Sequence, residues 1–164
     1  MRAVVLSDNI PWNGLEGEWG LSVHIAHRGT EILLDAGASG LFLENAKRLG
    51  IDLSRLNYAV LSHGHSDHSN GMETFFETVP EARFYVRPRC DACYMLEDGK
   101  MTYGGVPQAV VERFGDRMTF VEGDLSPSEG VWLIPHKTPG LAAYGEADGM
   151  YIARGGKLEP DDYA

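Results

Sequence analysis

The chain has 164 residues, 43% of them hydrophobic, which is enough for a substantial core, and we expect one domain. Lys and Arg total 14 against 24 Asp and Glu, so the formal net charge is -10. This charge disfavours a nucleic-acid backbone or an anionic membrane surface as a partner. No stretch approaches the roughly 20 apolar residues of a membrane span, and the N-terminal apolar run is too short for a signal peptide. We therefore expect a cytoplasmic protein.

Apolar patterns along the chain predict alternating strands and helices. The first predicted strand covers residues 3–7, a long loop covers 8–20, and a hairpin follows from Ser22 to Leu34. Further strands are predicted at 58–61, 82–86, 118–121, 131–134 and 150–153. Helices are predicted from a cap at Ser39 to a stop at Gly50, then at 72–79 and 106–114, whereas 88–105 is predicted to be irregular or partly helical. This order indicates a layered α/β protein.

The cysteines and one isolated histidine favour structural roles. Cys90 and Cys93 form a Cys-x-x-Cys segment, but no further Cys or nearby His in the sequence completes a four-ligand zinc site. The segment also lacks the βαβ pattern typical of thioredoxin-like proteins, so we predict two reduced structural thiols. His24 lies alone within a predicted strand, and we interpret it as a packed residue.

The densest chemical signal in the chain is His63-Gly64-His65-Ser66-Asp67-His68, directly after an apolar strand. On an extended segment His63 and His65 point to the same side, so both imidazoles can reach one cation. Asp67 and His68 continue around the turn and can reach a second cation. Imidazole with one carboxylate suits zinc, with iron or manganese as second choices, and does not suit calcium or magnesium.

These residues carry a family resemblance. His-x-His-x-Asp-His after a hydrophobic strand resembles the signature of the metallo-β-lactamase superfamily, and residues 33–37 (Leu-Leu-Asp-Ala-Gly) resemble its strand ending in Asp-Thr-Gly. Residues 18–22, 35–53 and 157–163 resemble a narrower branch, labelled 7,8-dihydropterin-6-methyl-4-(β-D-ribofuranosyl)aminobenzene-5′-phosphate synthase. The resemblance spans almost the whole chain.

The resemblance implies an α/β (α+β) fold, the αββα sandwich of the superfamily, and a centre with two divalent metal ions. His63 and His65 would ligate one ion, and Asp67 and His68 the other, with Asp67 also a catalytic residue. Two such ions can activate a shared water for attack on a carbonyl or phosphorus centre. Asp35 would orient a histidine or the loop by hydrogen bonding; ordinary turn chemistry is its alternative role.

The family's sequences continue beyond the segment that matches residues 160–162, into a Gly-Cys-Ser-His-like strand end and a later ligand. This chain ends at Ala164. We therefore expect residues 1–164 to be one metallo-β-lactamase-like domain, the N-terminal part of the sandwich, incomplete at its C-terminus. His136 lies in a segment similar to the Thr-Pro-Gly-His of glyoxalase II, but Leu141 follows Gly140 where that family has His, so we interpret His136 as a turn or solvent-exposed residue.

The function expected from these features is that of a metal-dependent hydrolase or lyase, which acts on a small, phosphorylated, cyclic or pterin-type metabolite through metal-activated water. Trp12 and Trp19, in the long loop, are candidate walls for a flat ring, unless they pack against the sandwich. One alternative is a non-catalytic metal-binding or assembly module, existing as a homodimer or with a complementary chain over its exposed half. An inactive truncated fragment is another, and a glyoxalase II-like thioester hydrolase is less favoured.

Overall fold

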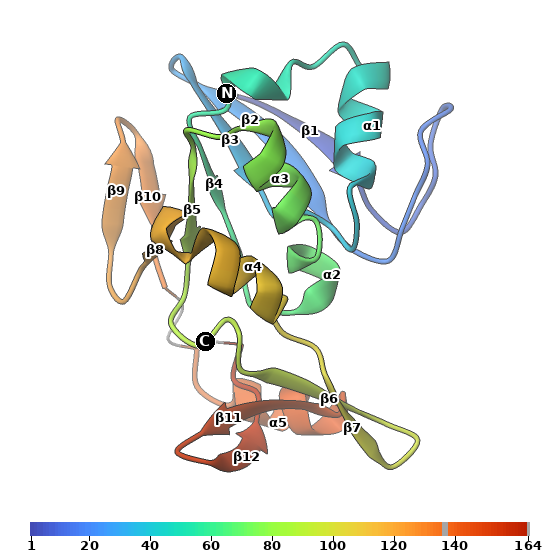
Figure 1. The fold of residues 1–164 in the computed structure, drawn as a ribbon, viewed down its shortest axis with the longest axis vertical. Coiled ribbons are helices and arrows are strands. Elements are labelled where there is room, and N and C mark those ends of the chain that lie inside the picture. The colour runs from blue at the N-terminus through green and yellow to red at the C-terminus, as the bar shows by residue number, and fades with distance from the viewer. Residues whose placement is uncertain (136–137, 164) are drawn as a thin grey trace.

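The larger sheet of the protein has six strands, and its parallel half leads into the histidine motif (Figure 1). The computed structural model describes residues 1–135 and 138–163. In spatial order the strands are β1 (Arg2–Ser7), β2 (Ser22–His27), β3 (Thr30–Leu34), β4 (Tyr58–Val60), β5 (Arg83–Val86) and β8 (Met118–Phe120). Strands β1 to β3 are antiparallel, and β3, β4, β5 and β8 are parallel. The loops that leave the parallel strands therefore begin at one edge of the sheet, where sites in such sheets form.

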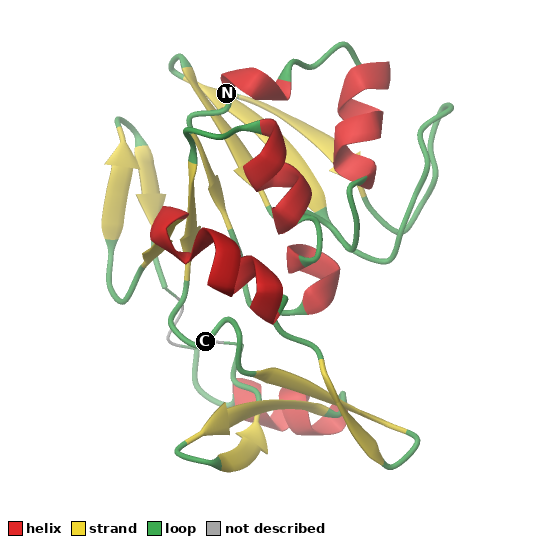
Figure 2. Cartoon of the chain, in the orientation of Figure 1, coloured by secondary structure: helices red, strands yellow, loops and turns green. Residues whose placement is uncertain are grey.

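Helices cover one face of this sheet (Figures 1 and 2). They are α1 (Leu41–Arg48), α3 (Met72–Thr78) and α4 (Gln108–Phe114), and shorter turns occur at α2 (Ser66–Ser69), η1 (Leu53–Arg55) and η2 (Gly115–Arg117). Phe42 of α1, Phe75 of α3 and Phe84 of β5 are fully buried between the layers. The rings of Phe75 and Phe84 meet edge to face, with their centroids 5.0 Å apart. The main hydrophobic core thus lies directly behind the strands that carry the site.

The opposite face of the sheet is contacted by a separate hairpin, β9 (Leu125–Ser128) and β10 (Val131–Leu133). Because side chains alternate along a strand, Tyr58 points away from the helices that pack against Ala59. The Tyr58 hydroxyl lies 2.8 Å from the Ser128 hydroxyl, and Arg28 pairs with Glu129 at 2.6 Å. These contacts hold the turn of the hairpin against this face.

A second, antiparallel sheet lies at the lower end of Figure 1. Its strands, in spatial order, are β12 (Lys157–Pro160), β11 (Met150–Arg154), β6 (Cys93–Glu97) and β7 (Lys100–Tyr103), and α5 (Leu141–Ala147) contacts β11 and β12. The backbone N–H of Ser66 donates to the carbonyl of Gly104, at 2.8 Å. This bond ties the histidine loop to the segment that follows β7.

The structure confirms the strands predicted near residues 3–7, 22–34, 58–61, 82–86, 118–121, 131–134 and 150–153 and the three predicted helices. Helix α1 begins one residue later than expected: Gly40 is its N-cap, and the Ser39 hydroxyl accepts the Leu41 N–H. The prediction of an irregular or partly helical segment at 88–105 is wrong. Asp98 and Gly99 both have positive φ, 50° and 75°, and this turn closes the β6–β7 hairpin.

Among the described residues, the pattern also does not predict β9, β12, α5 and the short turns α2, η1 and η2. Each is short, and the apolar side chains of β9 and β12 are few. No helix among residues 1–135 and 138–163 is long and apolar enough to cross a membrane.

Candidate metal centre

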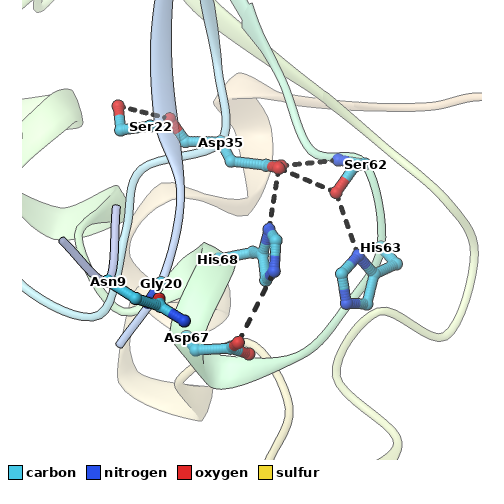
Figure 3. Close-up of polar contacts among 8 residues, drawn as sticks. All are labelled: Asn9, Gly20, Ser22, Asp35, Ser62, His63, Asp67 and His68. Atoms are coloured by element: carbon cyan, nitrogen blue, oxygen red, sulfur yellow. Dashed lines mark hydrogen bonds and ion pairs between the residues drawn. The ribbon is translucent and has the colours of Figure 1, made fainter. Parts of the chain in front are cut away.

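Asp35 is the anchor of the site at the edge of the large sheet (Figure 3). It directly follows β3, is fully buried, and has a φ of 57°, a left-handed conformation that costs a non-glycine residue on the order of 1 kcal/mol. Its Oδ1 accepts the backbone N–H of Ser62 at 2.7 Å, and its Oδ2 accepts the Ser62 hydroxyl at 2.8 Å. The same Oδ2 lies 2.8 Å from His68 Nδ1. One carboxylate thus bonds the ends of two neighbouring parallel strands and a histidine.

His63, Asp67 and His68 form one candidate metal-binding cluster, which we call the half-exposed cluster. Their nearest ligand atoms lie within 4.8 Å of one another, and all three side chains are partly accessible to solvent. His68 Nδ1–H donates to Asp35, which leaves Nε2 to accept; Nε2 lies 3.5 Å from Asp67 Oδ2. The Ser62 hydroxyl, which donates to Asp35, lies 2.9 Å from His63 Nδ1 and can accept its proton. Both histidines therefore present Nε2 as the free ligand atom.

The charge states of these histidines differ. Burial, reinforced by the nearby His68 and His65, lowers the pKa of His63 to about 4, so its ring is neutral at pH 7. Burial opposes protonation of His68 too, but the hydrogen bond and charge of Asp35 outweigh it and raise its pKa. A neutral imidazole is the form that binds a metal ion. His63 is ready to bind as it stands, and His68 is held in position by an anion, as ligating histidines commonly are.

His65, Cys93 and Asp161 form a second candidate cluster, which we call the buried cluster. All three are at most 6% exposed, and their ligand atoms also lie within 4.8 Å of one another. His65 Nε2 lies 2.7 Å from Asp161 Oδ2. Burial opposes ionisation of Asp161, but the hydrogen bonds from His65 and from the Tyr163 backbone outweigh it and lower its pKa.

The two clusters lie side by side. The ring centroid of His63 is 4.6 Å from that of His65 and 4.2 Å from that of His68. The resemblance pairs His63 with His65 and Asp67 with His68. In the structure His65 also faces Asp161, and His63 also lies close to Asp67 and His68.

Cys90 and Cys93 form no disulfide in the structure, and both are buried. Burial raises the pKa of each to about 12. The sequence has no histidine close to the Cys-x-x-Cys segment, but the structure brings His65, 28 positions earlier in the chain, into one cluster with Cys93. The sequence could not show that these residues are close, because their proximity depends on the packing of the second sheet against the histidine loop.

Two glycines allow this packing. A Cβ on Gly64 would come within 2.5 Å of the carbonyl oxygen of Cys90, so only glycine lets the histidine loop lie directly on the cysteine segment. A Cβ on Gly20 would overlap the carbonyl oxygen of Asp67. Gly20 is held in turn by its N–H, which donates to Asn9 Oδ1 at 3.1 Å (Figure 3).

The structure places the two loop tryptophans differently. Trp19 is 74% exposed and lines both a cavity of about 430 Å³ shared with Asp67 and His68 and one of about 90 Å³ shared with His65 and Cys93. Trp12 is 75% exposed and lines a separate cavity beside β1, which none of the candidate ligands borders. Of the two expected walls, only Trp19 lies at the candidate site.

A further cavity, of about 250 Å³, opens beside Ser62. Its walls come from the ends of β4, β5 and β10, and include Tyr85, Arg87, Trp132 and Tyr163. The Nε atom of Arg87 is buried and has no hydrogen-bond partner among the described residues. Sequence reasoning missed Arg87, for which the sequence carries no signal, and it missed Asp161, although Asp161 lies in the Pro-Asp-Asp segment already noted.

Two histidines outside the clusters also have roles predicted from the sequence. His24 is buried in β2, and its Nε2 lies 2.9 Å from Glu31 Oε2, which confirms a packed strand residue. His136 lies outside the described residues. Leu141, the residue that replaces the glyoxalase II histidine, is the first residue of α5.

The model of the metallo-beta-lactamase superfamily matches residues 20–149, which is most of the chain. The chain belongs to the metallo-β-lactamase superfamily. The uncharacterized protein MJ0448 of Methanocaldococcus jannaschii is 34% identical over 73 residues, which cover 44% of this chain and 28% of that protein.

Solved structures agree with this membership of the metallo-β-lactamase superfamily. Tm1679, described as a metal-dependent hydrolase of the beta-lactamase superfamily, matches with a TM-score of 0.75 and 27% identity, over 98% of this chain and 57% of that one. A B3 metallo-beta-lactamase with an active site glutamic acid matches with a TM-score of 0.53 and 16% identity, over 88% and 55% of the two chains, and supports the fold alone. The predicted fold class is confirmed. The chain spans little more than half the length of these structures, and 28% of MJ0448.

Metallo-β-lactamase-fold proteins bind divalent metal ions, commonly zinc, and the donors of this chain fit such ions. The half-exposed cluster offers two imidazoles and a carboxylate, and the buried cluster offers an imidazole, a thiol and a carboxylate. These are the ligand types of zinc and iron rather than of calcium or magnesium.

Proposed function

We propose that this protein is a metal-dependent hydrolase or lyase that acts on a small anionic metabolite. The observation that carries the proposal is the half-exposed cluster, where His63, Asp67 and His68 converge beside solvent-accessible cavities. Divalent ions bound there would supply a water of lowered pKa and a positive charge for the transition state. The acidic chain and the absence of a basic run in the sequence favour a small molecule over a nucleic acid.

The chain's own residues prepare the site for this chemistry. Asp35 holds Nδ1 of His68, so Nε2 faces the cluster, and Ser62 does the same for His63. The lowered pKa of His63 keeps its ring neutral and able to bind. Asp67, at the start of α2, offers a carboxylate to a metal ion and to the proton of a bound water.

The cavity beside Ser62 supports a substrate that carries both an anion and a flat apolar part. Arg87 offers a guanidinium whose Nε is unpartnered among the described residues, and planar guanidinium groups bind phosphate with two parallel hydrogen bonds. Tyr85 and Trp132 line the same cavity and can contact a ring. A pterin-type or other cyclic phosphorylated metabolite combines these features.

Metal-loaded protein should therefore hydrolyse members of a panel of phosphate monoesters, phosphodiesters and cyclic phosphates, and chelation should abolish the turnover. His63→Ala should lose both the turnover and one equivalent of bound metal. Arg87→Gln should raise the KM for phosphorylated substrates about 10- to 100-fold with little change in bound metal, in line with the loss of a charged hydrogen bond. Arg89→Gln, an exposed position two residues away, is the matched control and should leave KM unchanged.

The same panel of substrates distinguishes an enzyme from a non-catalytic metal-binding module. Protein that binds metal and phosphorylated ligands but turns over no member of the panel would favour the non-catalytic metal-binding module and overturn the enzymatic proposal. Turnover of thioesters alone, unaffected by Arg87→Gln, would instead favour the glyoxalase II-like activity.

A further inference from the structure

The second sheet places two potential metal ligands beneath the histidine loop. Cys93 is the first residue of β6, and Asp161 directly follows β12. Strand β11 lies between these two strands and pairs Ile152 with Cys93 and Tyr151 with Pro160. The N–H of Asp161 donates to the carbonyl of Met150 at 2.9 Å, which fixes the carboxylate beside the start of β6.

The backbone around this cluster leaves little room for rearrangement. The carbonyl of Cys93 accepts the N–H of Gly104 at 3.0 Å, and Gly104 in turn accepts the N–H of Ser66, next to His65. On the other side, Gly145 of α5 packs so closely on the Asp161 backbone that a Cβ would overlap it. Three segments far apart in the sequence are thus held together at one buried point.

The donor set at this point is that of a metal site. A tetrahedral site with metal–ligand bonds of about 2.0–2.3 Å has its ligand atoms roughly 3.3–3.8 Å apart, so atoms within 4.8 Å need only small side-chain movements. The alternative is a hydrogen-bonded His65–Asp161 pair beside a cysteine that packs as a small apolar residue. That alternative explains the pair and the burial of the thiol, but it leaves the approach of the sulfur to within 4.8 Å of a ligand atom of each partner without a chemical role.

We propose that Cys93, as a thiolate, and Asp161 join His65 in binding a divalent metal ion of zinc or iron type at the buried cluster. The thiol gives up its proton to solvent as the metal–sulfur bond forms, because the thiolate is the ligand. The inference goes beyond the proposed function, since it concerns a second position next to the half-exposed cluster and does not depend on turnover.

Cobalt(II) tests the proposal, because a cobalt–thiolate bond gives an intense charge-transfer absorption in the near ultraviolet that imidazole and carboxylate ligands do not give. Reduced protein titrated with cobalt(II) should develop this band. Cys93→Ser should abolish the band and weaken cobalt binding at this position by about 100-fold or more, since loss of a direct ligand exceeds the 10- to 100-fold cost of losing its orienting partner. In Asp161→Asn, the cobalt concentration that gives half of the full band should rise at least 10-fold. Cys90→Ser, equally buried and three residues away, should leave it unchanged.

Circular dichroism and thermal unfolding of each metal-free variant check that it is folded. The wild-type titration needs no variant, so cobalt binding without a thiolate band would overturn the proposal even if Cys93→Ser failed to fold. A band that survives Cys93→Ser, or that disappears in Cys90→Ser, would also overturn it. The two proposals can be tested separately. A thiolate band without turnover would contradict only the proposed enzymatic function, and turnover without a thiolate band would contradict only metal binding by Cys93.

Discussion

The half-exposed cluster and the buried cluster share one histidine loop but differ in how they are held. The first is held from above, by Asp35 and Ser62 at the ends of parallel strands, and faces cavities open to solvent. The second is held from below, by the small antiparallel sheet, and is almost inaccessible. The open cluster suits a position where a substrate and water exchange, and the closed one suits an ion that stays bound.

Removal of the Asp35 carboxylate should break this comparison most strongly. Asp35→Ala leaves three part-buried groups, the Ser62 N–H, the Ser62 hydroxyl and His68 Nδ1, without their acceptor. At about 1–3 kcal/mol for each buried unsatisfied group, partly offset by relaxation and water, the free energy of unfolding should fall by roughly 3–4 kcal/mol. Urea unfolding of the metal-free protein measures this loss.

Where Asp35→Ala remains folded, metal binding should fall about 10- to 100-fold at the half-exposed cluster. The cobalt–thiolate band should persist, because Asp35 has no bond to the buried cluster. Asp35→Asn, which tolerates a positive φ and keeps one acceptor, is the matched control and should lose less stability. Equal loss of metal at both clusters would show that they are one cooperative unit.

Gly64 lies between the two clusters, so its substitution should affect both. In Gly64→Ala the new methyl would lie 2.5 Å from the Cys90 carbonyl oxygen and 2.8 Å from its Cα, and the two backbones must separate. We expect the free energy of unfolding to fall by about 1–3 kcal/mol, which is typical of overpacking. The affinity for cobalt should fall at both clusters.

The control for Gly64 is Gly115→Ala, which changes the stability by less than about 1 kcal/mol because its Cβ would meet no atom within 4 Å and its φ is -58°. If Gly64→Ala altered only the half-exposed cluster, the cysteine segment would be shown to move independently of the histidine loop. Cobalt titrations of the two variants side by side make this distinction.

Ser62→Ala should sharpen the comparison, because it removes one hydroxyl and leaves Asp35 in place. The hydroxyl donates to Asp35 and accepts from His63 Nδ1, so its loss frees the ring of His63 to turn. We expect about 1–2 kcal/mol less stability and a several-fold weaker metal affinity at the half-exposed cluster alone. Ser54→Ala removes an exposed hydroxyl that bonds Asp52 and should change neither the stability by more than about 0.5 kcal/mol nor metal binding. An unchanged affinity in Ser62→Ala would mean that Asp35 alone orients the site.

The residues of the half-exposed cluster can be found from the sequence because they are local, although their grouping in the structure differs from the pairing that the resemblance implies. His63, Asp67 and His68 lie within six positions of one another, and the apolar run before them predicts the strand that places them. Asp35 is farther away, but it also ends a recognisable strand. The core is predictable for the same reason, since Phe42, Phe75 and Phe84 follow helical or alternating periods.

The buried cluster could not be predicted in this way. Its three residues are spread over 97 positions of the sequence. Cys93 and Asp161 come close because β11 pairs with both β6 and β12 in the small sheet. That sheet depends on short strands with weak patterns and on the tight turn at Asp98-Gly99. Side-chain periodicity reports which face a residue occupies, and it carries no information on which distant strands become neighbours.

The smallest expected effect on stability is at Trp19, which reaches cavities beside both clusters. Because the side chain is 74% exposed, Trp19→Leu should change the free energy of unfolding by less than about 0.5 kcal/mol. It should nevertheless raise the KM for ring-containing substrates several-fold, since a flat face beside Asp67 is lost. Trp12→Leu, equally exposed but in a cavity that no candidate ligand borders, should leave KM unchanged. If both variants raised KM equally, the substrate would have to contact the whole loop; if neither did, the ring would contact only Tyr85 and Trp132 of the Arg87 cavity and not Trp19.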